Sequence, residues 1–210
     1  TKLQSIQAMI ENGTATYQQA NEYAIEVGEA LATTFERHIT SETLPDGKMY
    51  YNIADRILNP TLSNNHEIVA RVSAEIQEQL NRSAGLGLIG IEPGVNQARI
   101  DSIINRVVAE EVFDDVAWIL QEPVVNFTQS VVDDTIKANV EFQGESGLNP
   151  RIIRTAHGSE PCDWCIEMEG TYKYPDVPAG VYGRHDRCRC TVEYDPGDAR
   201  RQNIWTREWS

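Results

Sequence analysis

The spacing of apolar residues changes once along this chain of 210 residues, and that change constrains the fold more than any other feature. Up to about residue 146, apolar side chains recur every three or four residues, which is the period of a helix with one buried face. Beyond residue 147, short runs of β-branched and aromatic residues alternate with Gly, Pro and Asp, a pattern typical of short strands and turns. The sequence therefore predicts a mainly α fold, with an acidic helical region (1–146) followed by a small α+β module with short strands (147–210).

Turn residues divide the helical region into segments. Pro60 should end one helix, because proline disfavours a helical conformation at the residue before it, and one of Ser63, Asn64 or Asn65 should cap the next. The glycine-rich stretch 85–90 is expected to be an apolar loop or a short strand, and it lacks the glycine patterns of phosphate-binding loops. The expected helices are 3–10, 16–39, 50–57, 68–80, 95–120 with a candidate break at 110–115, and 126–142; the expected strands are 151–155, 171–174 and 190–194.

Charge is distributed unevenly between the two regions. Residues 1–146 carry 9 basic and 22 acidic side chains, a net charge of −13, whereas residues 147–210 carry 9 and 10, a net charge of −1. Acidic pairs such as Asp133-Asp134 are expected on solvated helix faces, because charged side chains are rarely buried unpaired. Nucleic acids are bound through Lys and Arg side chains that neutralise phosphates. We therefore expect the helical region to contact protein, and any DNA contact to be made only by the C-terminal module, whose basic residues include Arg184, Arg187, Arg189, Arg200 and Arg201.

The four cysteines are all confined to residues 162–190. Cys162 and Cys165 form a C-x-x-C turn, and 19 residues later the segment H-D-R-C-R-C supplies His185, Cys188 and Cys190. Thiolate and imidazole groups from two short turns are typical ligands of a structural Zn²⁺ site. Five candidates compete for four positions: Cys188 and Cys190 lie on one face of an extended strand, or His185 and Cys188 form the second pair. A surplus of ligands favours a closed structural site over a catalytic one with a vacant position.

Other interpretations of the cysteines are weaker. Two disulfides would close the same module, but residues 1–4 have neither the basic nor the apolar character of a secretory signal, and a reducing cytosol favours metal. A redox C-x-x-C would need a βαβ context, which is not predicted here. A zinc deaminase needs an upstream H-x-E, and none of the four histidines has Glu two positions later. No apolar run approaches the roughly 20 residues of a membrane-spanning helix, so we expect no membrane association.

The order of these residues resembles the C-terminal motif of the phage Mu F-like head morphogenesis proteins, which are minor capsid proteins of tailed phages. The resemblance covers about residues 157–205, a quarter of the chain. Family members often have His-Pro-Asn before Cys-Arg-Cys, where this chain has His185-Asp186-Arg187. The matching features are the C-x-x-C pair, Gly170, Tyr172-Lys173-Tyr174, the H-x-x-C-R-C segment, Val192-Glu193-Tyr194 and Gln202-Asn203-Ile204-Trp205.

This resemblance implies a virion component present in few copies, which acts in head assembly in the host cytoplasm and lies near the portal or the inner capsid. Its implied partners are portal, major capsid or scaffold proteins, and it carries over no catalytic residue, so we expect no enzymatic activity. The alternative is a zinc-dependent nuclease or toxin-like enzyme in which His157 and His185 take part in the chemistry. A third possibility is a zinc adaptor module that binds other proteins.

Overall fold

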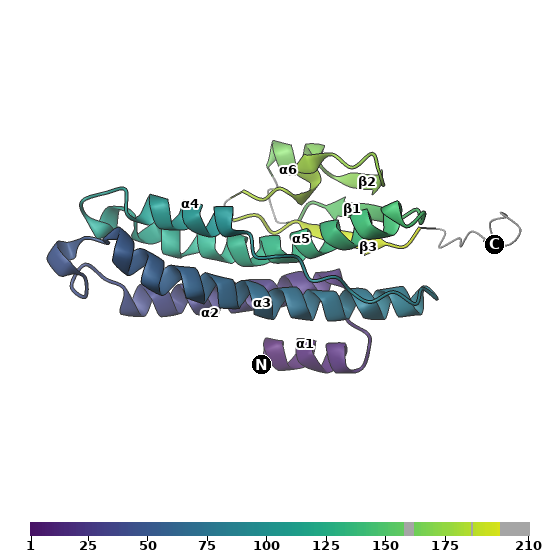
Figure 1. Ribbon diagram of the computed structural model, residues 1–210, viewed down its shortest axis with the longest axis horizontal. Coiled ribbons are helices and arrows are strands. Elements are labelled where there is room, and N and C mark those ends of the chain that lie inside the picture. Colours follow the sequence, from purple (N-terminus) through teal and green to yellow (C-terminus); the bar gives the residue numbers. More distant parts are fainter. Residues whose placement is uncertain (158–161, 186, 198–210) are drawn as a thin grey trace, which may run out of the picture.

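A computed structural model describes residues 1–157, 162–185 and 187–197 (Figure 1). Asp186, Arg200, Arg201 and the segment 202–205, which the sequence analysis singled out, lie outside the described residues. The helices are α1 (Lys2–Glu11), α2 (Tyr17–His38), α3 (Tyr51–Ser83), α4 (Gln97–Val107), α5 (Glu122–Glu145) and α6 (Asp163–Glu167), and the strands are β1 (Arg151–Thr155), β2 (Gly170–Lys173) and β3 (Thr191–Asp195). The predicted mainly α fold with a small stranded module is confirmed.

The first two helices follow their sequence signals closely. Thr1 and Thr16 each cap a helix, with Gln4 and Gln19 completing a capping box in which side chain and backbone satisfy one another. Helix α2 packs against α5 at Gly28, where an added Cβ would lie 2.9 Å from the Cα of Val125. This close approach requires glycine, and it brings the backbones of the two long helices together.

Helix α3 runs without interruption through Pro60, so the predicted end of a helix at this residue is wrong, as is the predicted cap at 63–65. Proline removes one backbone hydrogen bond and crowds the preceding turn. Pro60 is on the exposed side of α3, however, while Leu58 and Leu62 on either side of it are fully buried. The burial of these two leucines stabilises the continuous helix against the local preference of proline.

The segment between α4 and α5 confirms the candidate break. Helix α4 ends at Val107, and two 3-10 turns follow, Phe113–Asp115 and Ala117–Leu120. Helix α5 then begins at Glu122, earlier than predicted, with Pro123 in its first turn. Proline is well tolerated there because the first N–H groups of a helix have no partner within the helix.

The three strands form an antiparallel sheet in the order β2-β1-β3. Ile152 on β1 and Val192 and Tyr194 on β3 belong to the same buried apolar cluster as residues of α1, α2, α3 and α5. The sheet therefore packs directly against the helices, chiefly through β3 on α2 and α5. Within the described part of the chain, no helix has the length and apolar character needed to cross a membrane.

Candidate metal centre

The C-x-x-C pair lies at the start of α6, a one-turn helix that was not predicted. Cys162 is the N-cap residue of α6, and its Sγ accepts a hydrogen bond from the backbone N–H of Cys165 at 3.4 Å. This cap folds the turn back on itself and places both sulfur atoms on one side. Cys162 is exposed and Cys165 is buried.

The second pair of cysteines lies directly before β3. The backbone N–H of Cys188 donates to the carbonyl of His185 at 3.1 Å, which closes a turn, and Arg187 within that turn has a positive φ of 60°. Cys188 and Cys190 are 1% and 2% exposed. The turn and the residues that lead into β3 thus present His185, Cys188 and Cys190 toward α6.

All five predicted ligand residues meet in one cluster. Their ligand atoms form two groups, Cys162–Cys165–His185 and Cys165–Cys188–Cys190, and within each group the atoms lie within 4.8 Å of one another. The Nε2 of His185 lies 3.2 Å from the Sγ of Cys162 and 2.9 Å from that of Cys165. Cys165 belongs to both groups, so these residues are close enough to bind a metal ion. All four cysteines are free thiols.

The thiols differ in how readily they release a proton. The hydrogen bond with Cys188 lowers the pKa of Cys190 to about 7 against the opposing effect of burial, and the backbone N–H of His157 lowers it further. The same thiol–thiol hydrogen bond, together with burial, raises the pKa of Cys188 to about 12. Burial also raises the pKa of Cys165. Since metals bind the thiolate form, Cys190 is the thiol best prepared to act as a ligand.

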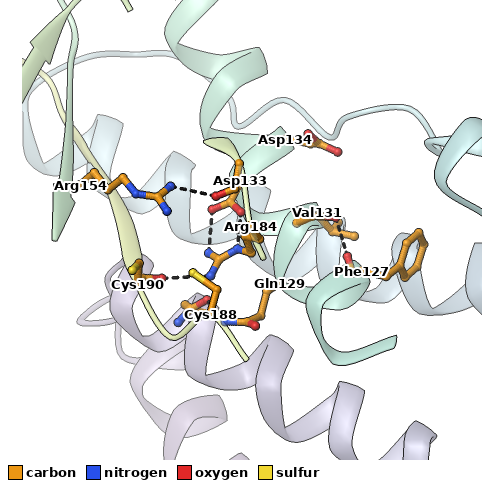
Figure 2. Close-up of polar contacts among 12 residues, drawn as sticks. Phe127, Gln129, Val131, Asp133, Asp134, Arg154, Arg184, Cys188 and Cys190 are labelled. Carbon is orange, nitrogen blue, oxygen red and sulfur yellow. Dashed lines mark hydrogen bonds and ion pairs between the residues drawn. The ribbon is translucent and has the colours of Figure 1, made fainter. Parts of the chain in front are cut away.

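The electrostatic surroundings of the cluster fit an anionic metal–thiolate centre. Arg154 on β1 is 1% exposed; its Nη1 donates to the carbonyls of Val181 and Gly183, and its guanidinium also faces the carboxylate of Asp133 (Figure 2). Its guanidinium lies 5.0 Å from the ring of Trp164 in α6, and it lowers the pKa of the neighbouring Cys165 against the larger effect of burial. A buried cation needs a compensating anion, and three or four thiolates around a divalent ion would supply one or two negative charges.

A second buried arginine joins the cysteine cluster to the helices (Figure 2). Arg184 donates through Nε and Nη2 to the two carboxylate oxygens of Asp133 on α5, the latter at 2.8 Å, and through Nη1 to the carbonyl of Cys190 at 3.0 Å. The side chains of Arg184 and Asp133 are 4% and 1% exposed. Gln129, one turn before Asp133, donates to the carbonyl of Cys188 at 3.2 Å in the amide orientation that satisfies both of its ends.

The prediction that Asp133 lies on a solvated helix face is therefore wrong. Asp133 shares a face of α5 with Gln129, Ile136 and Val140, all of which are buried, so its position in the apolar stripe was the available signal. Burial raises the pKa of Asp133, against the opposing effects of Arg184 and Arg154. One buried carboxylate thus faces two buried guanidinium groups, which leaves an excess of one positive charge beside the thiols.

The remaining candidate residues lie outside the cluster. The Nε2 of His157 is 3.0 Å from the hydroxyl of Thr191, and His157 belongs to neither ligand group. Arg189 lies 2.7 Å from Glu122, so it and Arg184 are both engaged with carboxylates, while Arg187 is exposed. Two of the arginines considered for DNA contact therefore make internal ion pairs.

Comparisons with protein-family models, with curated protein sequences and with solved structures gave no match to this chain.

Proposed function

We propose that this chain is a structural, non-enzymatic protein of a tailed phage, a minor capsid or head morphogenesis protein, in which a zinc ion stabilises the C-terminal module. The observation that carries the proposal is the cluster of thiol and imidazole groups at Cys162, Cys165, His185, Cys188 and Cys190, within the same segment that resembles the phage family. Its partners would be portal, major capsid or scaffold proteins, and its location the virion.

Zinc is favoured by the ligand chemistry. Thiolate and imidazole ligands select Zn²⁺ among the abundant divalent ions, and four of them complete its tetrahedral shell. Three of the five ligand residues are buried, and two buried arginines lie beside the cluster. A catalytic site needs an open coordination position with a poised base, whereas here the ligands outnumber the positions. These features support a structural role.

A role in assembly is supported by the way the module is attached. Its sheet shares an apolar cluster with α2 and α5, and the Arg184–Asp133 pair joins the cysteine turn to α5. The metal would therefore stabilise a surface formed by the helices and the module together. The acidic helices, with a net charge of −13 over residues 1–146, favour protein partners over DNA.

Mass spectrometry of purified virions from a phage that encodes this chain tests the proposal. We expect the chain in the virion at a copy number close to that of the portal and far below that of the major capsid protein. Absence from virions and from assembling heads would overturn the assembly role. Cleavage of DNA or RNA by the purified chain, lost in His185→Ala and retained in a His38→Ala control, would establish the nuclease alternative instead.

A further inference from the structure

A groove between α4 and α5 forms a second candidate site, separate from the cysteine cluster. It encloses about 370 Å³, and the segment Gly183-Arg184 forms its third wall. From α4 it is lined by Arg99, Ile103 and Arg106, which share one helix face because they are spaced by four and three residues. From α5 it is lined by Pro123 and Phe127, also four residues apart. The two helices lie next to each other in Figure 1.

The charge of this groove is opposite to that of its surroundings. Only 9 basic residues occur in the first 146, yet two of them, Arg99 and Arg106, line this one cavity. Arg106 makes no ion pair with any described residue, and its guanidinium lies 5.1 Å from the ring of Trp118, which is 48% exposed. Arg99 makes one ion pair, with Asp134 at 3.9 Å, and its side chain is 39% exposed. Arg106 is therefore the unpaired cation of the groove, and an anionic partner would share Arg99 with Asp134.

The spacing of these cations and the lining between them define what would fit. Seven residues of α-helix separate Arg99 and Arg106 by about 10 Å. Ile103 and Phe127, which are 6% and 4% exposed, form an apolar floor between them. In a peptide with the polyproline II conformation, which has three residues per turn and a rise of about 3.1 Å, two carboxylates three residues apart lie on one side and about 9 Å apart, with the intervening side chains free to contact such a floor. A nucleic acid would need a longer cationic track, and the acidic helices would repel it.

We infer that this groove binds a short acidic segment of a partner protein, with one carboxylate on Arg99, one on Arg106 and an apolar side chain between them on Ile103 and Phe127. Arg184 lines the groove but adds little net charge to it, because Asp133 already neutralises its guanidinium. The inference is independent of the metal centre and of the proposed virion role. It assigns a recognition site to a cationic groove with an apolar floor on the described helical surface.

Fluorescence anisotropy with a fluorescein-labelled Glu-Leu-Leu-Glu peptide tests this inference on the full chain. We expect saturable binding that weakens as salt is raised, and no binding of a Gln-Leu-Leu-Gln peptide. The double variant Arg99→Gln/Arg106→Gln should bind about tenfold more weakly, since it loses two partly exposed ion pairs. Arg82→Gln is the matched control, because Arg82 is an exposed arginine of the neighbouring α3. This variant should bind the acidic peptide with the same affinity as the unaltered chain.

Three outcomes overturn the inference. The first is an absence of binding by the acidic peptide at millimolar concentration, and the second is equal binding by the double variant and the Arg82→Gln control. The third is tighter binding of a labelled oligothymidine than of the peptide at the same salt concentration, which would identify a nucleic-acid site. Circular dichroism of the double variant confirms that any loss of binding occurs in a folded protein.

Discussion

Replacing Arg184 with glutamine should destabilise the whole chain, because it removes the hydrogen-bonded counter-charge of the buried Asp133 carboxylate and leaves only the guanidinium of Arg154 facing it. The two side chains are 4% and 1% exposed, and Arg184 uses two nitrogens on Asp133 and a third on the carbonyl of Cys190. Breaking a buried pair by removing one partner typically costs about 3–5 kcal/mol. A domain of this kind has a total stability of about 5–15 kcal/mol, so we expect a folded but markedly weakened protein.

Two further variants separate this effect from a general loss of charge. Arg189→Gln removes a neighbouring arginine whose side chain is 35% exposed and pairs with Glu122 at 2.7 Å, and it should cost no more than about 1 kcal/mol. The double variant Asp133→Asn/Arg184→Gln removes the buried carboxylate together with its ion-pair partner, so it should be more stable than Arg184→Gln alone. The order of stability is therefore the unaltered chain first, then Arg189→Gln and, lowest, Arg184→Gln.

Urea unfolding followed by helical circular dichroism measures all four proteins under one condition, with zinc present at the same concentration. Equal slopes of free energy against urea show that the variants unfold from comparable states. The reasoning is refuted if Arg184→Gln lies within about 1 kcal/mol of Arg189→Gln. It is also refuted if the double variant is no more stable than Arg184→Gln, because the cost then does not come from an Asp133 carboxylate that has lost its ion-pair partner.

Purified protein should contain about one zinc ion per chain, and a chelator should lower its free energy of unfolding; metal-free protein with two intact disulfides would contradict the zinc proposal. Arg154→Met should weaken zinc affinity about 10- to 100-fold in competition with a chelating dye, because it removes the buried charge beside Cys165, whereas Arg151→Met on the same strand should leave affinity unchanged. Burial raises the pKa of Tyr194 to about 12, above its unfolded value near 10, so its stabilising contribution is complete below about pH 10 and is lost as the pH rises toward 12. The stability of the unaltered chain should therefore fall more between about pH 9 and 11.5 than that of Tyr194→Phe, and equal falls would contradict this assignment. Pro60→Ala should raise the free energy of unfolding by about 2 kcal/mol, since it restores a backbone hydrogen bond in α3, and an unchanged value would show that the exposed turn already tolerates proline without cost.

The helices were predictable where their determinants are local. The apolar periods over 3–10 and 16–39 act within one or two turns, and the structure confirms the two helices that they predict. Pro60 shows the limit of such rules, because its preference for breaking a helix was outweighed by the burial of Leu58 and Leu62 against distant elements. A local sequence pattern indicates the conformation that a segment favours by itself. Tertiary packing determines whether the segment adopts that conformation in the folded protein.

The cysteine cluster was predictable because residue type and spacing specify it almost completely. The groups around it were not, since Arg184 and Asp133 are 51 residues apart and Arg154 lies on a third element. No pattern in the sequence predicts a contact between residues that far apart. The general tendency of carboxylates predicted Asp133 at the surface; its position in the apolar stripe of α5 indicates burial, and Arg184 supplies the counter-charge that allows it.

The distribution of charge inside the molecule is opposite to that outside, and this links the metal centre to the helices. The surface of the helical region is acidic, but beside the cysteines one buried carboxylate faces the guanidinium groups of Arg154 and Arg184. Thiols in their protonated form leave that excess positive charge uncompensated, whereas thiolates bound to the proposed metal ion would neutralise it. Because Arg184 also fixes Asp133 on α5, the charge state of the thiols affects the packing of a helix that spans the core. Removal of the metal should therefore destabilise α5 as well as the small module that supplies the ligands.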